Sequence, residues 1–525
     1  MKLFTKILSL VLCLILICGI FAGCGKDGNE SRVSSAPTNS LIGLGGGMGA
    51  GNGSKFALKI PEENLLYANT FETAWEGLGE GETVDLKLEK KNGSAYTTVL
   101  EKTGLSGTEF KDSTKLENET VYKLTLTAVA KDGTKTERLK EFTAVNLIKN
   151  TSVNAGMDFS FDGSISEKVL NNYLSRAISY VNANNDDAIR AILNTGTKYV
   201  CRSAAEWYPS EWFETNWLPI YKVLIEKAHA VDPDIVFESC IFETTGKDIN
   251  TIKIPAFVFE AFGKKVENRT FDHRKMLFPD GFGKDMWASG YSLPDITQEE
   301  TQMFIYYRAC KIIDAGFEAI HLGQTKQTGK NDRNLKRWTK VINLIREYAK
   351  KNARRHYVII NSHHPSHDFK SADGTFLVDF NMSPMRPKEV GAANSSPQKC
   401  ELDLESDAPY KKGIGGTSPS GWTTSKYPYL VEYDNYAPNK DDNVWGMDEI
   451  SWIVNQPESY RRSFQTEVRK MVAALNNNGH VALIGKRSTS YTTNGIELYI
   501  MNNEKYCKGG LSDEDAIIAA FKAYK

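Results

Sequence analysis

Two stretches of the chain alternate apolar and polar residues with the short period of half-buried β-strands. One runs from Val84 to Glu89 and the other from Tyr122 to Val129, and turn residues follow them at 91–93 and 131–133. Several short strands divided by such turns are typical of a β-sandwich. We therefore expect residues 55–148 to form an all-β sandwich of about one hundred residues.

The chain from residue 149 to 525 shows a different pattern, in which short apolar runs alternate with amphipathic helices. The expected strands are 156–161, 198–202, 234–241, 319–322, 357–360, 376–380, 429–433 and 480–484, and the helices include 166–181 and 298–315. Strands alternating with helices in this way predict an α/β fold, the (β/α)8 barrel. A doubly wound open sheet is the alternative, but no glycine fingerprint follows the first strand. The chain is thus expected to be multidomain.

The first 23 residues carry the pattern of a secretory signal. Lys2 and Lys6 precede an apolar run from Ile7 to Ile20, which is too short for a comfortable membrane span. Ala22-Gly23-Cys24 resembles the bacterial lipobox, and this resemblance implies that Cys24 is acylated and anchors the protein on the extracytoplasmic side of the cell membrane. An ordinary signal peptide is the alternative. Residues 24–54 are rich in Gly, Ser and Asn, so we expect a flexible tether.

The sandwich segment also resembles one family. Trp75 lies on an early strand, and Leu116, Tyr122 and Ala128 follow at intervals of six residues. This spacing resembles the fibronectin type III pattern, which implies that the Trp and the Tyr are core residues. Modules of that family usually serve as spacers or weak binders.

Charge and cysteine usage exclude some classes of function. The net charge is −1, so there is no electrostatic case for nucleic acid binding. The five cysteines after Cys24 are scattered singly, without a zinc-binding Cys-x-x-Cys spacing or the density of a disulfide scaffold. No cofactor is expected.

Polar residues gather where the predicted strands end, which is where a barrel places its active site. Buried polar residues are costly unless they are paired or used, although strand-end residues can also cap helices or form ion pairs. We expect catalytic roles for Glu432, Glu238, Glu243 and Asp379. We expect substrate-binding roles for Asp158, Glu206, Trp207, Tyr208, His321, Gln324, Asn361, His363, His364, Tyr433 and Asp434.

Aromatic and acidic residues at one rim of a barrel resemble the sites of extracellular glycoside hydrolases, in which two carboxylates flank the scissile bond. The resemblance implies a carbohydrate substrate and a nucleophile at Glu432, on the seventh strand. The fourth strand ends in His321-Leu322-Gly323-Gln324 and lacks the Asn-Glu pair that would supply the acid. Glu238 or Glu243 is therefore the expected proton donor, with Asp379 next.

Two other functions stay open. His321, His363 and His364 could hold a divalent metal for hydrolysis, although the first strand has no His-x-His pair. Alternatively, the missing acid on the fourth strand favours a tethered lipoprotein that binds glycan without cleaving it.

Overall fold

The computed structural model describes residues 56–59, 64–404, 410, 414–435 and 444–523. The chain divides into two compact units. One holds the described residues up to Lys149 together with 185–194, and the other holds the remaining described residues from Asn150 onward. The signal segment, Cys24 and the tether lie outside the described residues. Among the residues that are described, no helix is long and apolar enough to cross a membrane.

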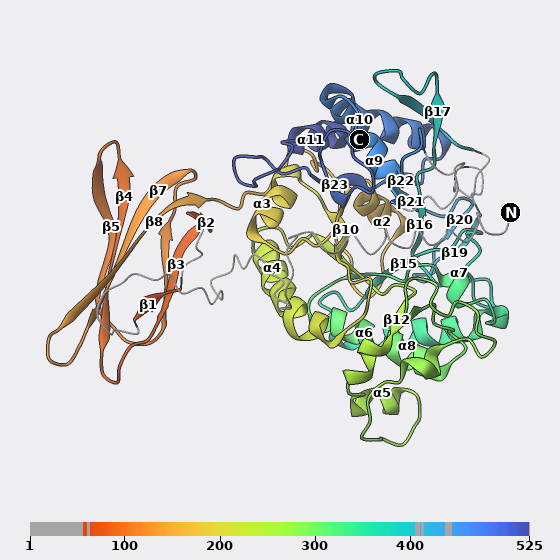
Figure 1. Cartoon of the computed structure of the whole chain (residues 1–525), viewed down its shortest axis with the longest axis horizontal. Coiled ribbons are helices and arrows are strands. Elements are labelled where there is room, and N and C mark those ends of the chain that lie inside the picture. Colours follow the sequence, from red (N-terminus) through yellow and green to blue (C-terminus); the bar gives the residue numbers. More distant parts are fainter. Residues whose placement is uncertain (1–55, 60–63, 405–409, 411–413, 436–443, 524–525) are drawn as a thin grey trace. The chain divides into compact units, whose positions relative to one another are not determined.

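Between Ala57 and Val145 every regular element of the described chain is a β-strand (Figure 1). The strands form a three-stranded sheet in the order β1-β3-β6 and a five-stranded sheet in the order β2-β8-β7-β4-β5. Trp75 and Tyr122 lie in a shared apolar cluster, and the backbone N–H of Glu117 donates to the Tyr122 hydroxyl. The strands are β1 (Ala57–Leu58), β2 (Leu65–Tyr67), β3 (Thr70–Glu76), β4 (Thr83–Asn92), β5 (Ala95–Leu105), β6 (Glu109–Lys115), β7 (Thr120–Val129) and β8 (Lys135–Val145).

The second unit is built on a curled sheet in the order β22-β21-β16-β15-β14-β11-β10-β9-β23-β24. Its strands are β9 (Ala177–Tyr180), β10 (Tyr199–Ala204), β11 (Val236–Cys240), β14 (Ala319–His321), β15 (Ile359–His363), β16 (Phe380–Pro384), β21 (Tyr429–Glu432), β22 (Gly479–Val481), β23 (Leu483–Ser488) and β24 (Leu498–Ile500). Only Ala482 separates β22, which pairs with β21, from β23, which pairs with β9, and both pairings are parallel. The sheet therefore curls back to its first strand, which is consistent with a TIM-like barrel.

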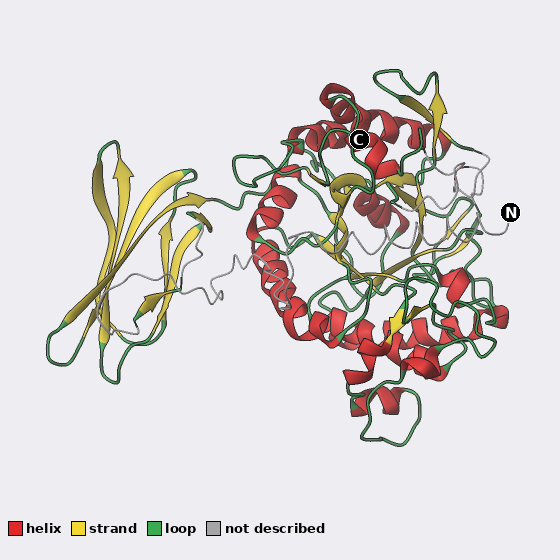
Figure 2. Cartoon of the chain, in the orientation of Figure 1, coloured by secondary structure: helices red, strands yellow, loops and turns green. Residues whose placement is uncertain are grey.

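Helices surround the strands of this unit (Figure 2). On α8 the buried residues Trp338, Val341, Ile342, Ile345 and Ala349 recur at helical spacing, so one stripe of the helix faces the protein interior. The α-helices of the described chain are α2 (Glu167–Leu174), α3 (Asp186–Thr195), α4 (Leu218–Val231), α5 (Ala256–Ala261), α6 (Glu299–Asp314), α7 (Thr325–Thr328), α8 (Lys336–Asn352), α9 (Glu449–Val454), α10 (Glu458–Leu475) and α11 (Glu514–Lys522). Of these, α3 belongs to the first unit except for its last residue.

Shorter elements lie in the connections. The π-helix η1 (Phe213–Trp217) leads into α4, and no helix separates β15 from β16, because residues 364–379, all of them described, form a loop. The small strand pairs are β12 (Thr245–Gly246) with β13 (Tyr291–Ser292), β17 (Pro387–Val390) with β18 (Lys399–Leu402), and β19 (Gly416–Thr417) with β20 (Thr423–Thr424).

The expected first strand, 156–161, is wrong. These residues form a loop, and the first strand is β9. The residues of β9 fall within the helix that the sequence predicts at 166–181, so that part of the predicted helix is also wrong. The helix begins at its N-cap Ser166 and ends at Leu174. The apolar side chain of Phe159 packs in the core cluster, which explains the apolar pattern of this segment. The Phe159 carbonyl accepts a hydrogen bond from Arg355, which precedes β15. The loop therefore closes the amino end of the barrel.

Candidate active site

Alternate residues of the strands turn toward the interior of the curled sheet, and these residues change from apolar to polar toward the carboxyl ends. On four strands, two inward-facing residues lie two positions apart. The first residue of each pair belongs to the apolar cluster inside the sheet, and the second, nearer the carboxyl end, is a buried polar residue. The pairs are Val236 and Glu238 on β11, Ala319 and His321 on β14, Ile359 and Asn361 on β15, and Leu430 and Glu432 on β21. The site is therefore a buried polar layer that lies on an apolar floor.

Glu432 is the centre of an ion-pair cluster. Arg202 binds both of its oxygens, with 2.8 Å between Nε and Oε2, and its Nη2 is close to Oε1. Arg487 Nη1 lies 2.9 Å from Oε2, and His363 Nε2 lies 3.2 Å from Oε1. Although burial alone would raise the pKa of Glu432, the two guanidinium groups and His363 hold that pKa well below its usual range. The group is therefore a carboxylate.

Arg202 reaches Glu432 because its strand is irregular. Arg202 adopts a left-handed φ of 57°, and the register between β10 and β11 shifts between Val200 and Ala204. Such a bulge re-aims a side chain, and a non-glycine residue with this φ carries strain. The backbone N–H of Arg202 donates to Glu238 Oε1 at 3.0 Å, which helps to fix this conformation.

Glu238 is fully buried and accepts hydrogen bonds from several neighbouring groups. It accepts from the Tyr199 hydroxyl at 2.8 Å and from Asn361 Nδ2 at 2.6 Å, in addition to the Arg202 backbone. Asn361 Oδ1 in turn lies 2.7 Å from His321 Nδ1. Burial raises the pKa of Glu238. Since both of its oxygens are occupied by these partners, Glu238 is better placed to orient Asn361 than to donate a proton to a substrate.

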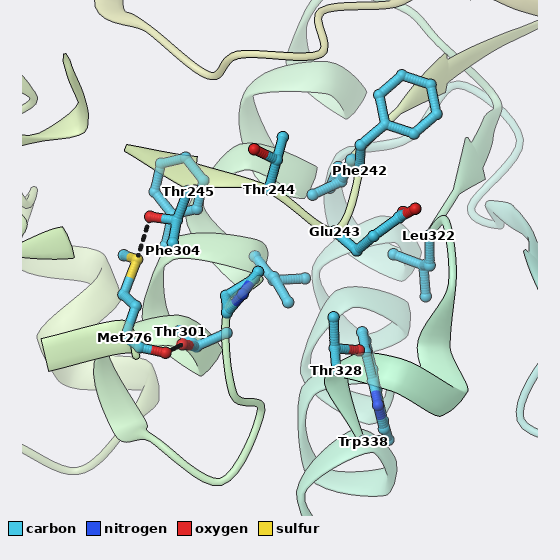
Figure 3. Close-up of a pocket in the computed structure, with 13 residues that line it drawn as sticks. Phe242, Glu243, Thr244, Thr245, Met276, Thr301, Phe304, Leu322, Thr328 and Trp338 are labelled. Carbon is cyan, nitrogen blue, oxygen red and sulfur yellow. Dashed lines mark hydrogen bonds between the residues drawn. The ribbon is translucent and has the colours of Figure 1, made fainter. Parts of the chain in front are cut away.

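Glu243 follows β11 and offers the freer carboxyl group. Its Oε2 accepts from the Gln324 backbone N–H at 3.0 Å, and it fits there because residue 323 is a glycine. A Cβ on Gly323 would lie 1.9 Å from that oxygen. In Figure 3 the carboxyl group points away from Met276 and Thr301, which line a small cavity on its other side. Burial raises the pKa of Glu243, while the charges of His363 and Arg202 oppose the shift.

Aromatic rings lie beyond the carboxyl ends of β10 and β11. Trp207 packs against Phe242 and Trp287, with ring centroids 5.1 Å apart in both pairs. Trp287 Nε1 donates to the Glu243 carbonyl at 2.7 Å, and the Tyr208 and Tyr291 rings lie 4.0 Å apart. Planar rings beside carboxyl groups can stack on the C–H faces of a sugar.

Several expected site residues have other surroundings. Glu206 accepts from Ser210 and lies 3.4 Å from Arg308 Nη1, and burial raises its pKa. Asp434 lies 3.8 Å from Arg386 Nη1. His364 stacks on Phe369 and lies 3.0 Å from the Thr325 hydroxyl, and burial lowers its pKa to about 4. These contacts are with other protein groups and do not join the cluster around Glu432.

The structure does not support the expected roles of three residues. Asp158 is exposed and accepts from Ser160 in a local turn, because the strand expected there is a loop at the opposite end of the barrel. Asp379 precedes β16, which starts about four residues later than expected, and it accepts from Tyr357, Arg346 and the Ile360 N–H. Tyr433 is fully buried because strand alternation turns it away from Glu432.

Two site residues were missed by the sequence reasoning, namely Arg202 and Arg487. Arg202 lies on β10 and Arg487 near the end of β23, and a basic residue at such a position is a usable signal. The bulge that turns Arg202 inward has no signature in the residue pattern. The His321 and His363 rings lie 4.9 Å apart, but the described part of the chain holds no group of three residues arranged to bind a metal ion.

Comparisons with known proteins give fold likenesses only. No family model matches the chain, and no curated protein does so either. Similar solved structures include a GH5 xyloglucanase of Bacteroides ovatus, at 10% identity over 89% of this chain and 100% of that chain, with a TM-score of 0.31. The type III pullulan hydrolase of Thermococcus kodakarensis matches at 11% identity, over 87% and 86% of the chains, with a TM-score of 0.35. Bacteroides uniformis β-glucuronidase 2 matches at 11% identity, over 80% and 44%, with a TM-score of 0.28.

These three neighbours are glycoside hydrolases by name. Their identities are low and their TM-scores lie below 0.5, so no residue role passes from them to this chain. The case for a reaction rests on the groups around Glu432 and Glu243.

Proposed function

We propose that this protein is a glycoside hydrolase that cleaves an oligo- or polysaccharide with Glu243 and Glu432 as its carboxylate pair. One observation carries the proposal: two buried carboxyl groups at the carboxyl ends of the strands have different partners. Both oxygens of Glu432 are held by Arg202, Arg487 and His363, whereas Glu243 accepts at Oε2 from the Gln324 backbone N–H. In agreement with this difference, burial raises the pKa of Glu243, and the cations hold the pKa of Glu432 below its usual range. Groups whose surroundings separate their pKa values in this way divide the acid and base roles of glycoside cleavage.

Glu243 is the proposed general acid. Burial favours its neutral form, so it holds a proton to give to the leaving-group oxygen as the glycosidic bond breaks. Glu432 is the proposed anionic partner. Arg202 and Arg487 hold Glu432 in its charged form. The carboxylate either stabilises the positive charge that develops on the sugar ring, or one of its oxygens forms a bond to the anomeric carbon as the glycosidic bond breaks.

A tethered glycan-binding protein is the second candidate, and one observation favours it. Both oxygens of Glu432 are already engaged by Arg202, Arg487 and His363, and the residue is completely buried. A nucleophile must present one oxygen to its substrate. In this second function the ion-pair cluster holds the barrel rim together, and the aromatic residues bind sugar without cleaving it.

The proposed enzyme is anchored outside the cytoplasm. The lipobox-like sequence at Cys24 supports a lipid anchor in the cell membrane, and the Gly/Ser-rich tether supports a spacer that holds the folded units away from the lipid. The spacing of Trp75, Leu116, Tyr122 and Ala128 supports a fibronectin type III-like domain at residues 55–148, which follows the tether in the sequence.

The two candidates are separated by measuring sugar release and glycan binding together. The full-length protein in detergent is incubated with plant, host and microbial glycans, with Glu432→Gln as the test variant and Asp158→Asn as the matched acidic control. A hydrolase releases sugar, and only Glu432→Gln abolishes the release. Binding without release by the wild-type protein supports the glycan binder. Loss of release in a chelator would instead point to a metal-dependent enzyme.

A further inference from the structure

The two carboxyl groups of the proposed site are closed off from solvent. Glu432 is 0% exposed, and Glu243 is only 4% exposed. A sugar chain therefore reaches them only if part of the protein that covers them moves aside. The connection 241–244 joins β11 to β12 and contains Glu243, so it lies at the carboxyl end of the strands (Figure 3).

Phe242 is the residue of this connection that covers the site. Its ring centroid lies 5.5 Å from the guanidinium carbon of Arg202 and 6.0 Å from the ring centroid of His321, and both of these residues are buried. Phe242 also packs against Trp207, which packs against Trp287, and all three rings are half-buried. Aromatic contacts thus run without a break from the buried polar layer to residues that reach the surface.

The connection is weakly held. Among the described residues, the hydrogen bond from Trp287 Nε1 to the Glu243 carbonyl, at 2.7 Å, is the only one that joins the backbone of residues 242–244 to another residue. The Thr244 hydroxyl is buried and has no hydrogen-bond partner in the described chain, which costs free energy in this conformation. Two small cavities also border the connection. Segments with few hydrogen bonds and loose packing open at low free energy.

We propose that Trp287 is a positioning residue that holds residues 242–244 in a closed conformation, and that the site opens to a sugar chain when its hydrogen bond to Glu243 breaks. In the closed conformation Phe242 covers Arg202 and His321, and Glu243 has a fixed position. In the open conformation the connection has moved aside, and the substrate enters. The inference rests on the proposed glycoside hydrolase function, but the opening is measured without a substrate.

Two buried cysteines report the opening in the native protein. Cys240 lines one of the cavities together with Phe242 and Thr244, so movement of the connection uncovers its thiol. Cys201 belongs to the apolar cluster inside the sheet, so its thiol is uncovered only when the barrel unfolds. The rates at which a thiol reagent labels the two residues, located by mass spectrometry, therefore measure local and global opening separately.

Trp287→Phe removes the indole N–H and keeps an aromatic ring. In the full-length protein in detergent, the labelling rate of Cys240 should rise by about fivefold while that of Cys201 stays the same, because one hydrogen bond is lost. Trp422→Phe is the matched control, since Trp422 Nε1 donates to the Ile165 carbonyl at 2.9 Å, and it should change neither rate. A Cys240 rate that Trp287→Phe leaves unchanged, or that rises only together with the Cys201 rate, overturns the proposal.

Sugar release gives a separate readout. Trp287→Phe should lower kcat by about fivefold without raising KM, because Glu243 loses its fixed position while the substrate still enters. A raised KM with an unchanged kcat would make Trp287 a substrate contact and would overturn its positioning role. A protein that releases no sugar but shows the expected labelling rates disproves the hydrolase function and leaves the opening supported.

Discussion

The close approach of Glu243 to Gly323 gives a sharp test of the proposed acid. In Gly323→Ala the new Cβ would lie 1.9 Å from Glu243 Oε2, so the carboxyl group must leave the Gln324 N–H. Gly323 also has a φ of +58°, at which an alanine costs about 1–2 kcal/mol. Loss of the hydrogen bond adds about 1 kcal/mol, so the free energy of unfolding should fall by about 2–3 kcal/mol.

Gly263→Ala is the matched control. Gly263 has a similar φ of +66°, but a Cβ there meets nothing within 4 Å, so it reports the backbone strain alone. Denaturant unfolding of both variants isolates the cost of moving Glu243.

The pH dependence of sugar release gives the second readout. Catalysis needs Glu243 protonated, so the rate falls as the pH rises through its pKa. Burial is the largest cause of the raised pKa, and a carboxyl group displaced toward water should titrate nearer its ordinary value of 4.5. The alkaline limb of the rate profile should therefore move to lower pH in Gly323→Ala and stay unchanged in Gly263→Ala. An unmoved alkaline limb in Gly323→Ala, with Glu243 shown to be displaced, would refute the assignment of Glu243 as the acid.

Other substitutions test other parts of the account. Glu432→Gln leaves two buried guanidinium groups short of their counter-charge, so unfolding at neutral pH should become easier by about 3–5 kcal/mol. Since the folded pKa of Glu432 lies below its unfolded value, this difference should shrink as the pH falls below 4.5, where the unfolded chain binds the proton first, and should be lost once the pH passes the depressed folded pKa. A difference independent of pH would contradict the ion-pair account. Asp158→Asn should change stability by less than about 0.5 kcal/mol and leave sugar release intact, because the residue is exposed and lies at the opposite end of the barrel. Cys24→Ser should move the protein from the membrane fraction to the soluble fraction, and retention in the membrane would contradict the lipid anchor.

Most of the strands in the second unit could be predicted from short apolar runs in the sequence. Seven of the expected strands overlap observed strands because short apolar runs between helices are a strong signal. The first strand failed because a run of helical spacing continued into Ile178, whereas the aromatic residues of 156–161 pack as a loop. Local periodicity cannot separate a buried strand from a helix end, since both are apolar.

Part of the geometry of the candidate site was predicted, and the failures have physical causes. Glu432, Glu243 and His321 were predicted because they lie at or after strand ends. Tyr433 was predicted because it is next to Glu432 in the sequence, but the alternation of side chains along the strand turns it outward. Arg202 was missed because a left-handed residue in a bulge decides where its side chain points. The proposed choice of Glu243 over Glu238 as the acid depends on which carboxyl oxygens already have hydrogen-bond partners, and the sequence does not hold that information.

Sugar release by Glu243→Gln tests the central claim most directly. Glu449→Gln is the matched control, because Glu449 is also a buried glutamate, whose pKa burial raises to about 7, and its oxygens bind the backbone N–H groups of Met385, Arg386 and Asp434. Released sugar is measured for the wild-type protein and both variants on the glycan that the wild type cleaves. The account predicts a loss of about 100-fold or more for Glu243→Gln alone. Release that is equal in Glu243→Gln and the wild type would contradict it.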